Sequence, residues 1–243
     1  MGGCGLGCDR AVTRVGVFVD GQNITIGARY AFGGSGAMHP LLLGRALAGD
    51  DTLVEIRYAS GLPDPRHDPR RAASSARRHE LMRRTDVVVL ERTLRYRWEW
   101  EIRDRDLPNP RSHQDEVRQA RVESRHRGQE KGIDVWLALD ALVMCTRADL
   151  DRVVIASADT DLDMVPHHLR SIPGQEGTEV VAAKIHPDDR DLHHNDAYDR
   201  TVGIDRAMFE VARDRFDYDE ELDDAEVTAF LDRIGSAGDG IRD

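Results

Sequence analysis

The segment "SADTDLDMVP", residues 157–166, places three carboxylates at alternate positions directly after an apolar run. Carboxylates crowded together repel one another, so the pKa of at least one is raised unless a cation lies among them. The segment is therefore either a solvated loop that caps a helix or part of a metal site. The three acids are Asp159, Asp161 and Asp163.

Acids from two other segments stand at the ends of predicted elements. Asp20 follows the apolar run at residues 15–19, and Asp134 begins a predicted helix after "KGI". Parallel α/β sheets form their sites beyond the carboxyl ends of the strands, so these two acids, Asp159 and Asp161 can face one crevice. Because the set contains only oxygen donors, with no clustered His or Cys, it favours Mg²⁺ or Mn²⁺.

Calcium binding, phosphoryl transfer and helix capping are further roles that such acids can have. A calcium-binding EF-hand loop starting at Asp159 would need Gly and Glu where the chain has Met164 and Arg170, so that loop is excluded. An aspartyl phosphatase usually has a second Asp two residues after the first, where this chain has Gln22. In a purely structural role, Asp159 or Asp161 would cap the helix that follows and Asp134 would complement its dipole. This role stays open, either in addition to metal binding or in place of it. Capping of that helix does not account for Asp20.

Apolar strands alternate with helices along the chain. This order predicts an α/β fold in which a mostly parallel central sheet of about five strands is covered by helices on both faces. The strands are expected at residues 15–19, 52–61, 86–91, 151–159 and 178–185. The helices are expected at residues 39–49, 68–85, 131–145 and 160–172.

The region that follows the third strand has a different character. Residues 94–102 alternate strictly between apolar and charged side chains, which is typical of a half-buried strand. Trp98 and Trp100 lie on its apolar face, and core packing fits them better than base stacking does. Residues 104–130 are polar and Arg-rich, as in a surface loop or a loosely held helix.

The net charge of −11 over 243 residues is not that of an obvious nucleic-acid binder. The charge is uneven, however, because residues 66–131 contain 18 Lys and Arg against 12 Asp and Glu. On the predicted helix at residues 68–85, four arginines form a basic stripe that either places a positive surface next to the acidic site or only keeps the helix soluble. These arginines are Arg77, Arg78, Arg83 and Arg84.

The cysteines and termini indicate the setting of the chain. Three cysteines give no disulfide framework, which fits a reducing cytoplasm. There is no signal-peptide pattern and no run long enough to span a membrane, so we expect a cytoplasmic protein. Residues 1–13 are expected to be disordered, and residues 214–243 to form an acidic, mobile tail. Whether the chain forms a homo-oligomer stays open.

Three segments together resemble a known family. "VGVFVDGQNI", "KGIDVWLALDAL" and "DRVVIASADTDL" are similar to the signature segments of the NYN domain, a branch of the PIN-like ribonucleases that includes the LabA-like bacterial proteins. The resemblance covers roughly residues 15–199 and suggests a domain over residues 14–213, with an Arg-rich insertion at about 91–130. It implies a PIN-like three-layer sandwich and a nuclease centre that depends on Mg²⁺ or Mn²⁺.

The resemblance also implies roles for individual residues. Asn23 would position the acids, Ser157 would support them with its hydroxyl, and Lys131 could orient a phosphate. Leu162 stands where the family often has Phe, and Asp163 is an extra acid outside the motif. Asp140 would either support the centre from behind or pair with an arginine. The acids carried over as catalytic and metal-binding residues are Asp20, Asp134, Asp159 and Asp161.

We therefore expect a metal-dependent ribonuclease that hydrolyses RNA phosphodiester bonds. In a two-ion arrangement, Asp20 and Asp159 would hold one ion, and Asp134 and Asp161 the other. One alternative is a non-catalytic RNA-binding or regulatory protein that keeps the same fold. A further alternative is a small-molecule phosphohydrolase, because no nucleic-acid motif outside the acidic centre decides the substrate.

Overall fold

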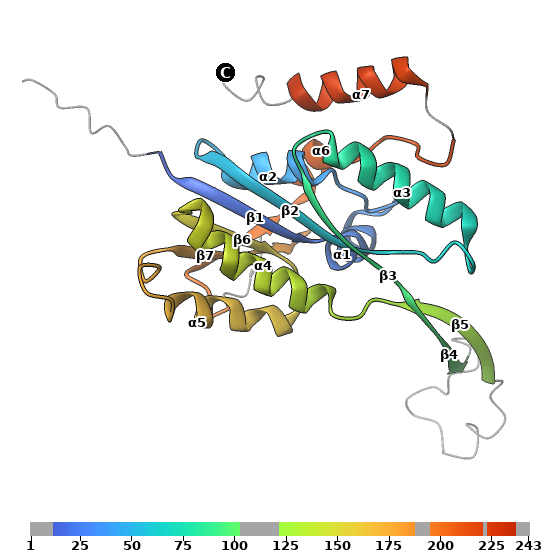
Figure 1. Cartoon of the computed structure of the whole chain (residues 1–243), viewed down its shortest axis with the longest axis horizontal. Coiled ribbons are helices and arrows are strands. Elements are labelled where there is room, and N and C mark those ends of the chain that lie inside the picture. The colour runs from blue at the N-terminus through green and yellow to red at the C-terminus, as the bar shows by residue number, and fades with distance from the viewer. Residues whose placement is uncertain (1–11, 103–121, 188–194, 221–222, 237–243) are drawn as a thin grey trace, which may run out of the picture.

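A six-stranded parallel sheet forms the centre of the computed structural model, which describes residues 12–102, 122–187, 195–220 and 223–236 (Figure 1). Its strand order is β3-β2-β1-β6-β7-β8, and every neighbouring pair is parallel. This confirms the predicted α/β fold, with β8 as a strand beyond the five expected. The strands are β1 (Arg14–Asp20), β2 (Thr52–Leu62), β3 (Val88–Thr93), β6 (Arg152–Ala156), β7 (Glu179–Ile185) and β8 (Arg200–Ile204).

Helices connect the strands and cover the sheet. None of the helices in the described ranges combines the length and apolar character that a bilayer span requires. They are α1 (Gly21–Phe32), α2 (Pro40–Ala48), α3 (Pro69–Arg83), α4 (Ile133–Ala148), the short 3₁₀ helix η3 (Thr160–Asp163), α5 (Met164–Arg170), α6 (Arg206–Ala212) and α7 (Asp224–Ser236).

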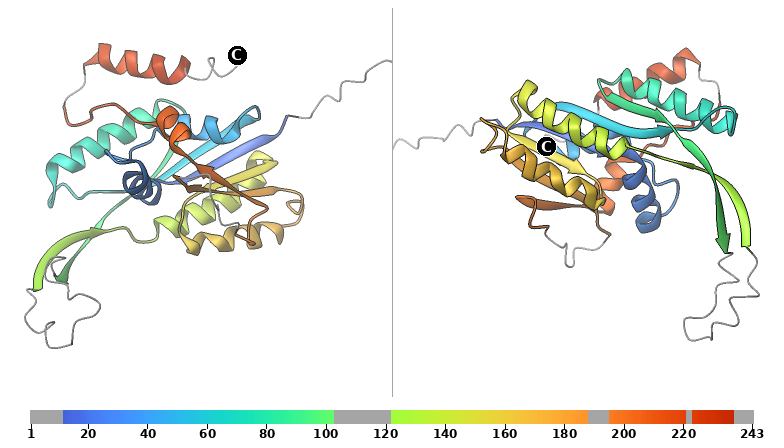
Figure 2. Two further views of the ribbon diagram at one scale, coloured as in Figure 1. Left: turned by 180° about the vertical axis from the view of Figure 1, so that it is seen from behind. Right: turned by 60° about the horizontal axis from the view of Figure 1, so that its bottom comes forward.

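The alternation of side chains along the strands divides the core into two layers. On β1, Val15, Val17 and Val19 pack against α1, α2 and α6, whereas Phe18 points to the opposite face, against α4 and α5. Successive residues of a strand face opposite sides of a sheet, so a strand buried on both faces must be apolar throughout. Figure 2 shows the two helical layers on either side of the sheet.

A separate antiparallel hairpin interrupts the α/β pattern between β3 and α4. It consists of β4 (Arg95–Ile102) and β5 (Val122–Gln129), and Figure 1 shows it extending away from the main sheet. The expectation of a loop or helix for residues 104–130 is therefore wrong from Val122 onward. Residues 103–121, and the side chains of Trp98 and Trp100, lie outside the described part of the structure.

Much of the acidic C-terminal segment is ordered, unlike the predicted mobile tail. Tyr218, Val227, Phe230 and Ile234 are buried against Leu81 of α3. The three apolar residues of α7 recur at the spacing of one helical face, so this face gains stability by covering α3. Disorder was also expected for residues 1–13. Of these, residues 1–11 lie outside the described ranges.

Candidate metal centre

Two adjacent strands deliver acids to the same end of the sheet. β1 ends at Asp20, and its parallel neighbour β6 ends at Ala156, directly before the turn that carries Ser157 and Asp159. Chain connections diverge from these two strands, because β1 leads to β2 on one side and β6 leads to β7 on the other. Such a switch point opens a crevice at the carboxyl ends of the strands, as the sequence predicts.

Asp20 is held by hydrogen bonds that also begin α1. Its Oδ1 accepts from the backbone N–H of Asn23 at 3.0 Å, which caps the helix, and its Oδ2 accepts from the Ser157 hydroxyl at 3.0 Å. The next residue, Gly21, has to be glycine because the Tyr58 ring occupies the space that a β-carbon would need. The D-G-x-N motif thus has a local structural reason besides its chemistry.

Asn23 and Ser157 join the ends of β1 and β6. The Asn23 side-chain oxygen accepts from the backbone N–H of Ala158 at 2.8 Å. The Ser157 hydroxyl, which donates to Asp20, accepts from the backbone N–H of Asp159 at 3.0 Å. Both side chains therefore link the turn after β6 to the end of β1. The roles expected for them in a functional site stay predictions.

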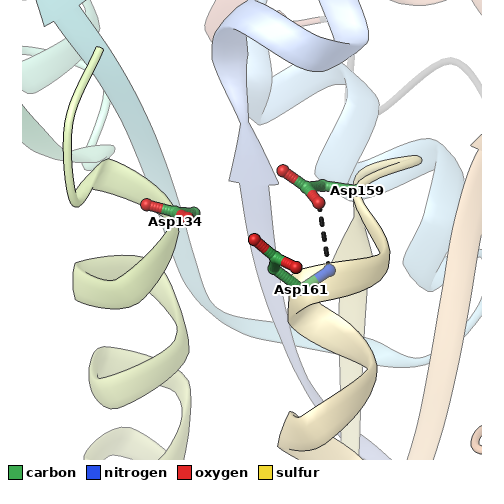
Figure 3. A group of neighbouring side chains, drawn as sticks. All are labelled: Asp134, Asp159 and Asp161. Carbon is green, nitrogen blue, oxygen red and sulfur yellow. Dashed lines mark hydrogen bonds between the residues drawn. The ribbon is translucent and has the colours of Figure 1, made fainter.

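Asp159 and Asp161 lie on one tight turn. The Asp159 carboxylate accepts from the backbone N–H of Asp161 at 3.0 Å and so caps η3 (Figure 3). Capping is therefore present in addition to any metal chemistry, as the sequence left open. One oxygen of Asp159 makes this bond, and the carboxylate keeps further lone pairs for other partners.

Asp134 approaches from α4. Gly132 precedes the helix with φ +71°, a left-handed conformation that suits glycine, and Asp134 then falls in the first turn. Figure 3 shows Asp134 across from the turn that carries the other two acids. One carboxylate oxygen from each of Asp134, Asp159 and Asp161 lies within 4.8 Å of the others.

These three carboxylates suit a divalent cation. They offer only hard oxygen ligands, which Mg²⁺ and Mn²⁺ accept, and they converge from two separate elements. Without a cation, three like charges at this separation would repel one another. The donor set therefore fits the ion that the sequence predicts, with Asp134, Asp159 and Asp161 as its holders.

Asp20 lies beside this group without being a member of it. It lines the same cavity as Asp134 and Asp159, a space of about 550 Å³, but is only 7% exposed. Burial raises the pKa of Asp20, the hydrogen bonds from Asn23 and Ser157 oppose that rise, and the charges of Asp159 and Asp134 add to it. The geometry thus groups three acids and sets the fourth behind them, a different division from the two pairs expected.

Sequence reasoning missed Glu130. Its side chain lines the cavity, and it accepts a hydrogen bond from the backbone N–H of Gly61. Burial, together with the charges of Asp20 and Asp134, raises the pKa of Glu130 to about 7. Its position four residues before Asp134 could have indicated that it belongs to the site. It stands, however, at the end of a segment that was interpreted as a surface loop or a loosely held helix.

Lys131 also lines the cavity, and its side chain is exposed. The role expected for it in orienting a phosphate stays a prediction. Asp140, by contrast, is not among the residues that line the cavity, and it pairs with Arg57 at 2.7 Å. Of the two roles open to Asp140 in the sequence, the structure shows the pairing.

The four arginines of the predicted stripe, three on α3 and Arg84 directly after it, do not form a common solvent-facing surface. Arg77 donates to the backbone carbonyls of Tyr218 and Asp219, and Arg78 pairs with Asp214 at 3.1 Å. These contacts hold the C-terminal segment against α3, which was not foreseen. Arg83 pairs with Glu91 at 2.9 Å, and only Arg84 is exposed without a side-chain partner among the described residues.

Comparison with known proteins adds the family. The profile of the NYN domain matches residues 14–188. A crystal structure of a protein of unknown function from Vibrio parahaemolyticus is similar, with 18% identity, coverage of 80% of this chain and 94% of that one, and a TM-score of 0.49. No curated protein matches the chain in sequence. Since the profile covers well over half of its residues, the chain belongs to the NYN domain family, part of the PIN-like nuclease superfamily.

Proposed function

We propose that this protein is a metal-dependent ribonuclease that hydrolyses RNA phosphodiester bonds. The observation that carries the proposal is the convergence of Asp134, Asp159 and Asp161 within 4.8 Å in a chain of the NYN domain family. Its further support is the solvent-open cavity that Asp134 and Asp159 line together with Lys131.

The chain's own residues have separable tasks in this reaction. Asp134, Asp159 and Asp161 would hold Mg²⁺ or Mn²⁺, and Asn23 and Ser157 would keep the turn in place. When bound, the ion supplies a lowered pKa for the attacking water and charge stabilisation at the leaving oxygen. Lys131 would attract and orient the phosphate. Asp20 and Glu130 line the same cavity and can accept a proton during hydrolysis.

The test is cleavage of a pooled single-stranded RNA library with Mn²⁺, with EDTA, and with two variants. Asp159→Asn keeps the shape of the side chain and should slow cleavage at least about 100-fold, equivalent to roughly 2.7 kcal/mol of transition-state stabilisation. Asp163→Asn is the matched control, because Asp163 lies on the same turn but outside the acidic group.

The control should cleave like the wild type, and EDTA should abolish cleavage in both. Equal loss of cleavage in Asp159→Asn and Asp163→Asn would show that cleavage depends on the conformation of the turn and not on the acidic group. If the protein binds RNA but cleaves it under no metal condition, the proposal of an enzyme is wrong, and the protein is a non-catalytic RNA-binding protein.

A further inference from the structure

A second cavity opens next to the acidic one. It lies between α1, α3, β2 and β4, has a volume of about 510 Å³, and is within the range of about 300–1,000 Å³ typical of small-ligand sites. We call it the arginine cavity and define it by Arg29, His67, Arg71 and Tyr96. None of these residues belongs to the acidic centre described above.

Two exposed arginines give this cavity its positive charge. Among the described residues, the Arg29 guanidinium donates only to the backbone carbonyl of Ser35, at 3.3 Å. The Arg71 guanidinium has no partner among the described residues. Its backbone N–H donates to the carboxylate of Asp68, the residue that caps α3. Neither guanidinium is neutralised by a carboxylate within the described ranges. This distinguishes both from Arg78, which also lines the cavity but is paired with Asp214.

An aromatic platform lies beside the arginines. The rings of His67 and Tyr96 are stacked, with their centroids 4.1 Å apart and their planes inclined by 29°. His67 is exposed, and both rings line the arginine cavity. Cationic grooves with stacking surfaces are the usual way in which proteins hold single nucleic-acid strands.

The two cavities share a wall. Gln22, Ile26 and Glu130 line both of them, and Ile26 exposes 41% of its surface on the ridge between them. The acidic side would repel a phosphate in the absence of a cation, while the arginine side attracts it. A strand that crosses the shared wall therefore places one phosphate at the acids and the next nucleotide among the arginines.

We propose that the arginine cavity is a binding subsite for the nucleotide next to the scissile phosphate of a single-stranded RNA. Arg71 and Arg29 contact its phosphate, and its base lies in the cavity against the aromatic pair of His67 and Tyr96. The choice of RNA rests on the proposed function. A base can enter this cavity only when it is splayed out of a helix, so the subsite selects single strands over duplexes.

The experiment measures the binding of a fluorescent, unstructured 15-nucleotide RNA in EDTA, where cleavage cannot interfere. Arg71→Glu should weaken binding at least tenfold. Arg70→Glu is the matched control, because Arg70 lies on the same helical turn, has the same charge and is exposed, but pairs with Asp219 outside the cavity. This control should change the affinity less than twofold.

Two further variants test the separate contacts. Arg71→Ala should flatten the dependence of log affinity on log salt by about 0.7, the contribution of one phosphate contact on a single strand. His67→Ala should weaken binding at least fivefold with an unchanged salt slope, because stacking involves no counterion. The same RNA in duplex form should bind at least tenfold more weakly to the wild type.

Equal affinities of Arg71→Glu and Arg70→Glu, or equal binding of single strand and duplex, would overturn the subsite. These outcomes are independent of the proposed function. If cleavage needs Mn²⁺ but Arg71→Glu binds normally, the subsite is wrong and the nuclease stands. If the variants weaken binding but no condition gives cleavage, the subsite stands and the nuclease is wrong.

Discussion

Titration of Glu130 should make the stability of the protein depend on pH, and the substitution Glu130→Gln should remove this contribution. Its pKa of about 7 in the folded protein lies above the ordinary value of 4.5. A raised carboxyl pKa means that the folded state disfavours the charged form. The unfavourable contribution is therefore absent below pH 4.5, grows as the pH rises toward 7, and is complete above it. Glu130→Gln abolishes this titration but keeps an oxygen that can accept from Gly61.

The size of the effect follows from the shift. The full difference in pKa corresponds to at most about 3.5 kcal/mol, because one pKa unit equals about 1.4 kcal/mol. Glu130 lines an open cavity, where solvent screening reduces this to about 1–2 kcal/mol. Relative to the wild type, Glu130→Gln should therefore gain about 1–2 kcal/mol of unfolding free energy between pH 4.5 and pH 8.

The assay is urea unfolding of the metal-free protein at several pH values, with EDTA present throughout. Glu220→Gln serves as the control, since Glu220 is an exposed carboxylate with no partner among the described residues. Its stability relative to the wild type should be the same at every pH. If Glu130→Gln also shows a constant difference from the wild type, Glu130 titrates normally and the reasoning from burial and neighbouring charge is refuted.

Two other substitutions test separate parts of the structure. Asp20→Ala should lose about 1–2 kcal/mol of stability because it removes the cap of α1, whereas Asp20→Asn can still cap and should stay within about 0.5 kcal/mol of the wild type; equal unfolding free energies for the two variants would contradict the capping role. Phe230→Ala should release α7 from α3, because a large buried aromatic contributes about 3–5 kcal/mol to packing; hydrogen exchange should accelerate in α7 and not in β1, and unchanged exchange in α7 would contradict this packing.

The sequence was most informative where local pattern and topology agree. Apolar runs followed by Asp20 and Asp159 predicted two parallel strands whose carboxyl ends meet, and β1 and β6 are indeed neighbours in the sheet. Asp134 was identified by its position at the start of a helix. The network through Asn23 and Ser157 then depends only on residues adjacent to these strand ends, which explains why the motif also indicated those two residues.

Long-range packing accounts for what the sequence did not show. Arg77 and Arg78 look like solvent-facing cations on α3, but the C-terminal segment folds back and uses both. Val227, Phe230 and Ile234 have helical spacing that would have predicted α7, although the acidic composition around them favoured a tail. Glu130 belongs to the site only because the chain between β5 and α4 lies beside Gly61 of β2, a contact that no local pattern contains.

The central claim is that Asp134, Asp159 and Asp161 form one divalent-cation site for RNA cleavage. It is tested most directly by Mn²⁺ binding, followed by electron paramagnetic resonance, in the presence of an RNA with phosphorothioate linkages that resist cleavage. Mg²⁺-type sites often need substrate phosphates to complete their ligands, so the RNA must be present. We expect the wild type and Asp163→Asn to bind Mn²⁺ equally and Asp134→Asn to bind at least about tenfold more weakly, a change of roughly 1.4 kcal/mol. Equal Mn²⁺ binding by Asp134→Asn and the wild type would contradict the claim.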